Sequence, residues 1–208
     1  MTAEKRLKII RNIFSQFDKN IFEGIILIGS MVYDRNYAIR KNSDIDLLFF
    51  VKNNNFNKVY NYKYFQGPFI CEKGKELFRQ GKIYGLWDDF IINGVTFNNG
   101  VVNYDYFKKY CRLETPETLR TYFEKKTDPE SGSLVQTKGE FRDNIIITSF
   151  LVNEIIFDKN GEIKNNLRLL LESINNKYSA GQIEKKIEFI LNKVKPKQRR
   201  KILQNLFS

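Results

Sequence analysis

Two short apolar runs in the first quarter of the chain give its clearest pattern. Residues 24–28 (GIILI) are rich in β-branched side chains and stop at Gly29 and Ser30. Residues 45–51 (IDLLFFV) form the second run. Runs of this length, bounded by turn residues, are typical of buried strands. We therefore predict two core strands, joined by a short helix and a loop over residues 31–43.

Apolar residues at three- and four-residue spacing predict helices around these strands. The first helix is amphipathic and starts behind Thr2, which can act as its N-cap. Its apolar stripe is Leu7, Ile10, Phe14 and Phe17. The other predicted helices cover residues 72–80, 104–110 and 115–125, with two more apolar stripes over residues 167–174 and 183–194.

A β-hairpin is predicted in the middle of the chain. Asn93 and Gly94 separate two apolar segments, residues 89–92 and 95–97. Asn-Gly is the strongest short turn signal, because both residues readily adopt a positive φ.

Proline, glycine and serine cluster at residues 128–133 and indicate a linker. We predict an N-terminal unit over residues 1–127 and a mainly helical region over residues 134–208. Within the second region, the apolar residues 145–157 fit a helix or a strand equally well. The predicted fold class is α/β (α+β) with a C-terminal helical portion.

The composition narrows the chemistry that the chain can perform. There is no histidine, which excludes a Ser-His-Asp triad and an imidazole base. Cys71 and Cys111 stand alone, without the paired spacing of a zinc site. The apolar runs are too short to span a membrane and no signal peptide is evident, so we expect a cytoplasmic protein. Carboxylates, lysines, tyrosines and metal ions remain as the means of catalysis, which favours metal-dependent chemistry.

The net charge of +11 is consistent with a polyanionic partner, or with a solvated lysine surface that needs none. Residues 181–208 carry eight basic and two acidic residues, a net +6, and the basic segment 195–201 could bind RNA phosphates. Residues 56–65 interleave aromatic residues with lysines. That segment could stack on bases, or form a half-buried strand or lid.

The strongest candidate site is built from Gly29, Ser30, Asp44 and Asp46. Because side chains alternate along a strand, Asp44 and Asp46 should point the same way while Ile45 enters the core. Two carboxylates held this close repel each other unless cations lie between them, and hard oxygen ligands favour Mg²⁺ or Mn²⁺. Gly29 would let a phosphate approach the backbone, and Ser30 offers a hydroxyl and an amide.

Gly-Ser followed after a connection by Asp-Ile-Asp resembles the signature of the nucleotidyltransferase superfamily, which has the DNA-polymerase-β-like fold. Its members include antibiotic-adenylylating enzymes, tRNA-modifying enzymes and toxins. The resemblance covers about the first 110 residues. It implies a mixed sheet flanked by helices, a nucleoside triphosphate donor with magnesium, and transfer of a nucleoside monophosphate. By position, Gly29 and Ser30 match the nucleotide-binding pair, and Asp44 and Asp46 match the metal ligands.

Members of this superfamily often carry a third carboxylate on a neighbouring strand, and the corresponding position here is Asn98. An amide can ligate a metal but cannot serve as a carboxylate base. Three explanations stay open. Asp88, Asp89 or Asp105 could supply the carboxylate, two ligands plus substrate phosphates could suffice, or the chain could bind nucleotide without catalysis.

The sequence therefore predicts a magnesium-dependent nucleotidyltransferase that uses a nucleoside triphosphate, ATP by preference. The expected acceptor is a hydroxyl of a small molecule such as an antibiotic. The alternatives are modification of RNA or protein, as by a toxin, and an inactive nucleotide-binding module.

Overall fold

The computed structural model describes residues 3–33, 43–65, 72–80, 85–112 and 152–177, with scattered residues from 179 to 204. These residues build a five-stranded sheet of order β3-β4-β2-β1-β5. Strands β2 and β4 are parallel and the other neighbours are antiparallel, so the sheet is mixed. The strands are β1 (Phe22–Ile28), β2 (Ile45–Val51), β3 (Gly85–Ile92), β4 (Val95–Asn103) and β5 (Glu154–Asp158).

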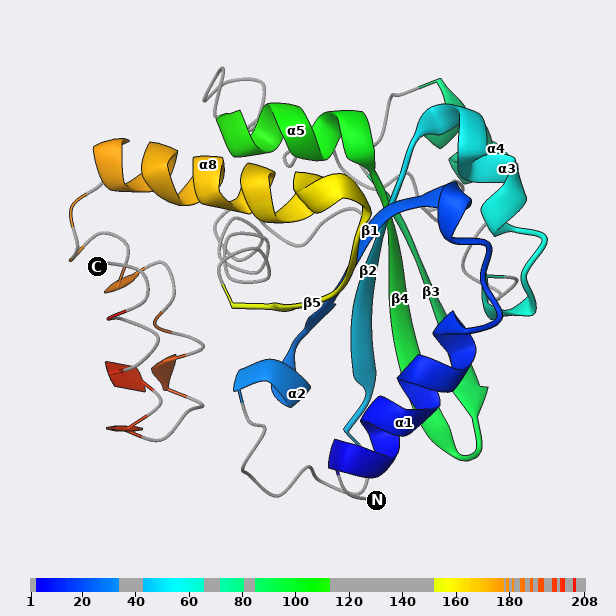
Figure 1. Ribbon diagram of the computed structural model, residues 1–208, viewed down its shortest axis with the longest axis horizontal. Helices are drawn as coiled ribbons and strands as arrows, with labels where there is room; N and C mark the ends of the chain where they lie inside the picture. The colour runs from blue at the N-terminus through cyan, green and yellow to red at the C-terminus, as the bar shows by residue number, and fades with distance from the viewer. Residues whose placement is uncertain are drawn as a thin grey trace.

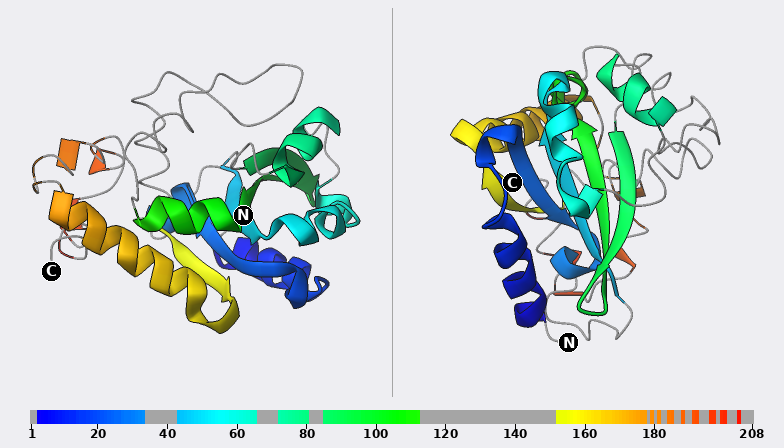
Figure 2. Two further views of the ribbon diagram at one scale, coloured as in Figure 1. Left: turned by 90° about the horizontal axis from the view of Figure 1, so that it is seen from above. Right: turned by 90° about the vertical axis from the view of Figure 1, so that its right-hand side faces the viewer.

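Helices lie on both faces of this sheet, which confirms the predicted α/β class. Figure 1 shows α3 and α4 to the right of the sheet and α5 and α8 to its upper left, and Figure 2 shows the same elements from two further directions. The helices are α1 (Ala3–Phe14), α2 (Ser30–Tyr33), α3 (Phe56–Val59), α4 (Glu72–Arg79), α5 (Tyr104–Arg112) and α8 (Glu162–Lys177). Short 3₁₀ turns cover Lys19–Ile21, Asn53–Asn55, Lys63–Phe65 and Lys159–Gly161.

The alternation of side chains along β2 assigns the two faces. Leu47 and Phe49 belong to a core that includes Ile10 and Ile13 of α1 and Phe56 of α3. Phe50, on the opposite face, packs against Phe107 of α5 with ring centroids 4.3 Å apart. The even-numbered residues of β2, Asp46 among them, therefore share the face that carries α5 and α8.

A two-residue turn closes the hairpin between β3 and β4, as the sequence predicts. Ile92 pairs with Val95, and Asn93 and Gly94 have φ angles of 50° and 72°. Both strands are longer than the predicted segments, because β4 continues to Asn103 alongside β2.

Residues 56–65 correct one prediction, because they form helical turns and not a strand. Phe56, Val59, Tyr64 and Phe65 are buried. Phe56 stacks on Phe78 of α4 at 4.1 Å between ring centroids. These aromatic side chains are committed to the core, which removes the basis for base stacking by them.

The C-terminal region contributes a strand as well as helices. Within the segment that fitted helix or strand, β5 forms at the edge of the sheet and pairs with β1. Asp158 then caps α8, its carboxylate accepting from the Ile163 and Lys164 amides at 2.8 and 2.9 Å. The helix predicted over residues 115–125, the linker at 128–133 and most of residues 181–208 lie outside the described residues.

Candidate functional site

Asp44 and Asp46 lie at the start of β2, where the sequence places them. Asp44 precedes the strand, Ile45 is completely buried at 0% exposure, and Asp46 is the second strand residue. A buried Ile45 between two partly exposed acidic residues is consistent with the predicted alternation, and Asp46 lies on the face that carries α5 and α8.

Backbone register extends this site across two more strands. Asp46 pairs with Asn98 of β4, and Asn98 pairs with Asp89 of β3. Directly paired residues place their side chains on the same face. We call Asp46, Asn98 and Asp89 the polar row. Its two carboxylates are two strand spacings apart, about 10 Å between Cα atoms.

Strand pairing distinguishes among the three acidic residues that could supply the third carboxylate of the site: Asp88, Asp89 and Asp105. Asp89 stands beyond Asn98 in the row. Asp88 pairs with Asn99 and is one residue out of register. Asp105 begins α5 beyond the far end of β4, and its carboxylate pairs with Lys108 at 3.2 Å. By backbone register, Asp89 is the one of the three that belongs to the polar row.

Gly29 meets this site from the end of β1. Its φ is +72°, and a Cβ atom at this position would lie 2.0 Å from Oδ2 and 2.8 Å from Cγ of Asp46. Two features therefore require glycine at this position. They are the positive φ and the Asp46 carboxylate, which leaves no room for a Cβ atom. The sequence suggested that a phosphate would use this space, whereas the structure shows that Asp46 already does.

Two buried side-chain oxygen atoms near the acidic pair have no hydrogen-bond partner among the described residues. They are the Ser30 hydroxyl oxygen, directly after Gly29, and the Asn98 side-chain oxygen, directly across from Asp46. Buried polar atoms in folded proteins are nearly always satisfied, and exceptions often mark a place for an ion, a water or a ligand. The helix behind Ser30 is a single turn of four residues, so any phosphate contact depends on the Ser30 side chain and local amides rather than on a helix dipole.

The environment of the site disfavours simultaneous ionisation of Asp44, Asp46 and Asp89. Burial, then the charges of Asp44 and Asp89, raise the pKa of Asp46 from 3.8 to about 7. Partial desolvation and Asp44 also raise the pKa of Asp89. A divalent cation would reverse this balance, because it favours the ionised carboxylates.

The residues present fit a magnesium ion that also binds substrate. Within the described ranges, no group of three or more acidic or cysteine side chains lies close enough to hold one ion. Mg²⁺ commonly takes only one or two carboxylates from the protein and completes its shell with water and substrate phosphates. Asp44 and Asp46 would supply that number, and the Asn98 oxygen could add a neutral ligand.

Arg6 is a residue near the site that the sequence analysis missed. It is 1% exposed and reaches from α1 to the start of β2, where Nη1 donates to the carbonyl oxygens of Ser43 and Asp44. A signal was present in the sequence, since Arg6 precedes Ile10 and Ile13 by four and seven residues and so shares their helical face. Arginine on a buried stripe is uncommon unless the group is paired.

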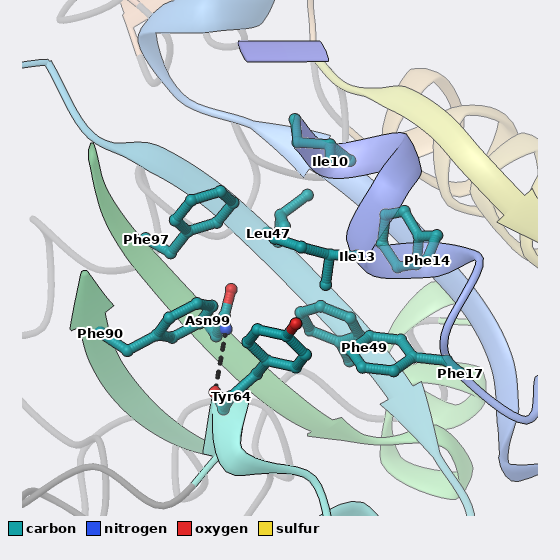
Figure 3. Close-up of a pocket in the computed structure, with 10 residues that line it drawn as sticks. All are labelled: Ile10, Ile13, Phe14, Phe17, Leu47, Phe49, Tyr64, Phe90, Phe97 and Asn99. Atoms are coloured by element: carbon teal, nitrogen blue, oxygen red, sulfur yellow. Dashed lines mark hydrogen bonds between the residues drawn. The ribbon is translucent and has the colours of Figure 1, made fainter. Parts of the chain in front are cut away.

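A hollow between α1 and the sheet lies on the opposite face from the polar row. Figure 3 shows its lining, which is apolar except for Tyr64 and Asn99, with the Asn99 amide donating to the Tyr64 carbonyl at 3.3 Å. Ile13, Leu47 and Phe49 belong to the core described above. This hollow is a packing feature of the core and offers no charged group to a nucleotide.

The remaining sequence candidates lie apart from the site or outside the described residues. Cys111 is a buried free thiol on α5 and burial raises its pKa well above the ordinary value, so it is not a ready nucleophile. Cys71 is outside the described residues. In the basic tail, Lys197, Arg199 and Arg200 are exposed.

No helix in the described part of the chain has the length and apolar character that crossing a membrane requires. A search of the sequence against protein-family models finds no match, and no curated protein matches it either.

Proposed function

We propose that this chain is a magnesium-dependent nucleotidyltransferase with the polymerase-β-like fold. It transfers a nucleoside monophosphate from a triphosphate, by preference ATP, to a hydroxyl group of a small molecule such as an antibiotic. The observation that carries the proposal is the convergence at one end of the sheet of Gly29, Ser30, Asp44 and the polar row. The unsatisfied oxygens of Ser30 and Asn98 lie on either side of Asp46 and support a ligand there.

Each residue has a role that its position supports. Asp44 and Asp46 would hold the metal ion, with the Asn98 oxygen beside them. The Ser30 hydroxyl would donate a hydrogen bond to the triphosphate. When bound, Mg²⁺ supplies Lewis-acid stabilisation of the negative charge that develops on the phosphoryl oxygens and the leaving pyrophosphate.

In the proposed reaction the acceptor oxygen attacks the α-phosphorus, and the bond to the bridging oxygen of pyrophosphate breaks. The proton of the acceptor hydroxyl needs a base. Asp89 is an exposed carboxylate on the same face, one strand beyond Asn98, and its raised pKa brings it closer to neutrality. Asp89 therefore acts as the general base, a role that the Asn98 amide cannot perform.

Transfer of label from [α-³²P]ATP tests the proposal. The wild-type chain with Mg²⁺ and pooled hydroxyl-bearing acceptors should give a labelled product and release pyrophosphate. The Asp44→Ala, Asp46→Ala double variant should give neither. ATP binding without pyrophosphate release from any acceptor would refute the transferase and favour the alternative below.

Asp89→Asn is expected to lower the rate of transfer by about 10²–10⁴-fold, the usual contribution of a general base. ATP affinity should change little, because Asp89 is two strands from Asp46. Steady-state kinetics on the acceptor found above would check this. Asp105→Asn is the matched control, since it removes one carboxylate outside the polar row. Equal rates for the two variants would exclude Asp89 as the base.

A nucleotide-binding module without catalysis is the second candidate, and Asn98 in the polar row favours it. The same residues would then bind Mg²⁺-ATP, and Asp89 would have no catalytic role.

RNA as the acceptor is the alternative within the transferase class. The exposed Lys197, Arg199 and Arg200 motivate it. Labelled RNA product that disappears on deleting residues 195–208 would favour that acceptor.

A further inference from the structure

A buried cation from the first helix, Arg6, reaches the backbone beside the acidic pair. Arg6 is among the largest fully buried side chains of the described residues. Burial of a guanidinium carries a large desolvation penalty unless charges and hydrogen bonds compensate it. Its position therefore calls for a specific partner.

That partner is the short stretch of backbone that carries Asp44. Nη1 of Arg6 donates to the Ser43 carbonyl oxygen in a very short contact, and to the Asp44 carbonyl oxygen at 3.4 Å. These two carbonyl groups precede the first residue of β2. Holding them limits rotation of the backbone on which the Asp44 side chain is mounted.

Arg6 also lies close enough to Asp44 for their opposite charges to interact: burial lowers the pKa of Arg6, and the negative charge of Asp44 opposes that shift. Because a positive charge beside the site would oppose a metal cation, any gain in metal affinity from Arg6 comes from its two carbonyl contacts.

We propose that Arg6 is a positioning residue of the metal–nucleotide site, which orients Asp44 through the Ser43 and Asp44 carbonyl groups. The inference rests on the proposed function, because it assigns Arg6 to the same site. Arg6 does not touch the substrate. Its effect should therefore appear in metal affinity, by about 10–100-fold, as for other groups that orient metal ligands from outside the coordination shell.

The test is a titration of Mn²⁺ in the presence of α,β-methylene-ATP, followed by electron paramagnetic resonance on the full chain. Arg6→Met keeps much of the aliphatic stem but removes the donors and the charge, and it should weaken Mn²⁺ binding at least tenfold. Arg6→Lys keeps the charge and should fall between Arg6→Met and the wild type. Arg11→Met, an exposed arginine on the same helix, should stay within twofold of the wild type.

Ile10→Ala separates positioning from simple loss of stability. Ile10 is buried in the core on α1 and has no polar side-chain group to bond the Ser43 and Asp44 carbonyls, so this variant should unfold at lower urea concentration yet bind Mn²⁺ normally when folded. Arg6→Met that behaves like Ile10→Ala would overturn the inference. If Arg6→Met does not fold, Arg6→Lys decides, and wild-type affinity in that variant overturns the inference.

The proposed function and the role of Arg6 fail in different ways. A wild-type chain that does not bind Mn²⁺ with the nucleotide analogue refutes both. A wild-type chain that binds, with unchanged affinity in the Arg6 variants, refutes only the role of Arg6.

Discussion

Asp46→Asn is expected to abolish metal-dependent transfer and, at the same time, to stabilise the protein. Loss of a direct metal ligand should reduce transfer by more than about 100-fold, since even groups outside the coordination shell contribute 10–100-fold. Stability should rise by about 2–4 kcal/mol at pH 8, because asparagine removes a carboxylate whose pKa in the fold is about 7 instead of 3.8. Urea unfolding and the label-transfer assay measure the two effects.

The pH dependence of this stabilisation has a definite sign. The folded chain binds the Asp46 proton more tightly than the unfolded chain, so the free energy of unfolding falls as pH rises from about 4 to about 7 and is level above that. The stability gap between Asp46→Asn and wild type should therefore narrow from pH 8 toward pH 4. Glu172→Gln, which removes an exposed carboxylate paired with Arg168, should show no such trend. A constant gap would show that Asp46 is not destabilised in the fold.

Gly29→Ala is expected to have the second-largest effect, and mainly on metal and nucleotide binding. The new Cβ would lie 2.0 Å from Asp46 Oδ2 and 3.1 Å from its Cβ, so the whole Asp46 side chain must move. Mn²⁺ affinity should fall at least tenfold, by the same argument as for displaced ligands. Backbone strain at φ +72° adds a stability cost of about 1–3 kcal/mol.

Gly94→Ala is the matched control for this substitution. Gly94 has the same φ of +72°, but nothing lies within 4 Å of an added Cβ. It should lose about the same stability from strain and keep full Mn²⁺ affinity. If the two variants bind Mn²⁺ equally well, the close contact between Gly29 and Asp46 does not contribute to metal binding.

The sequence predicted well those elements that local pattern determines. The apolar runs before Gly29 and after Asp44 became β1 and β2, and Asn93 and Gly94 form the predicted turn. Each of these signals needs only neighbouring residues. The acidic pair followed for the same reason, because alternation along one strand fixes the face of both carboxylates.

The choice among Asp88, Asp89 and Asp105 could not follow from local pattern. It depends on the parallel pairing of β2 with β4, which joins segments about fifty residues apart and is set by the packing of the whole sheet. A shift of one residue would have placed Asp88 in the row instead. The contact of Gly29 with Asp46 and the reach of Arg6 to Ser43 are long-range in the same sense.

The aromatic segment at residues 56–65 shows why composition alone misled. Alternating aromatic and lysine residues suit a binding surface and a buried helical turn with exposed lysines equally well. Phe56 and Phe65 entered the core because α4 and β2 offer apolar surface against them. Tertiary packing, and not local spacing, decided between the two.

The most direct measurement is a crystal structure of the chain with Mn²⁺ and α,β-methylene-ATP, with the metal located by anomalous scattering. The account predicts one Mn²⁺ about 2 Å from oxygens of both Asp44 and Asp46, with the triphosphate against Ser30. Mn²⁺ bound away from both carboxylates, or a nucleotide bound elsewhere on the chain, would contradict it.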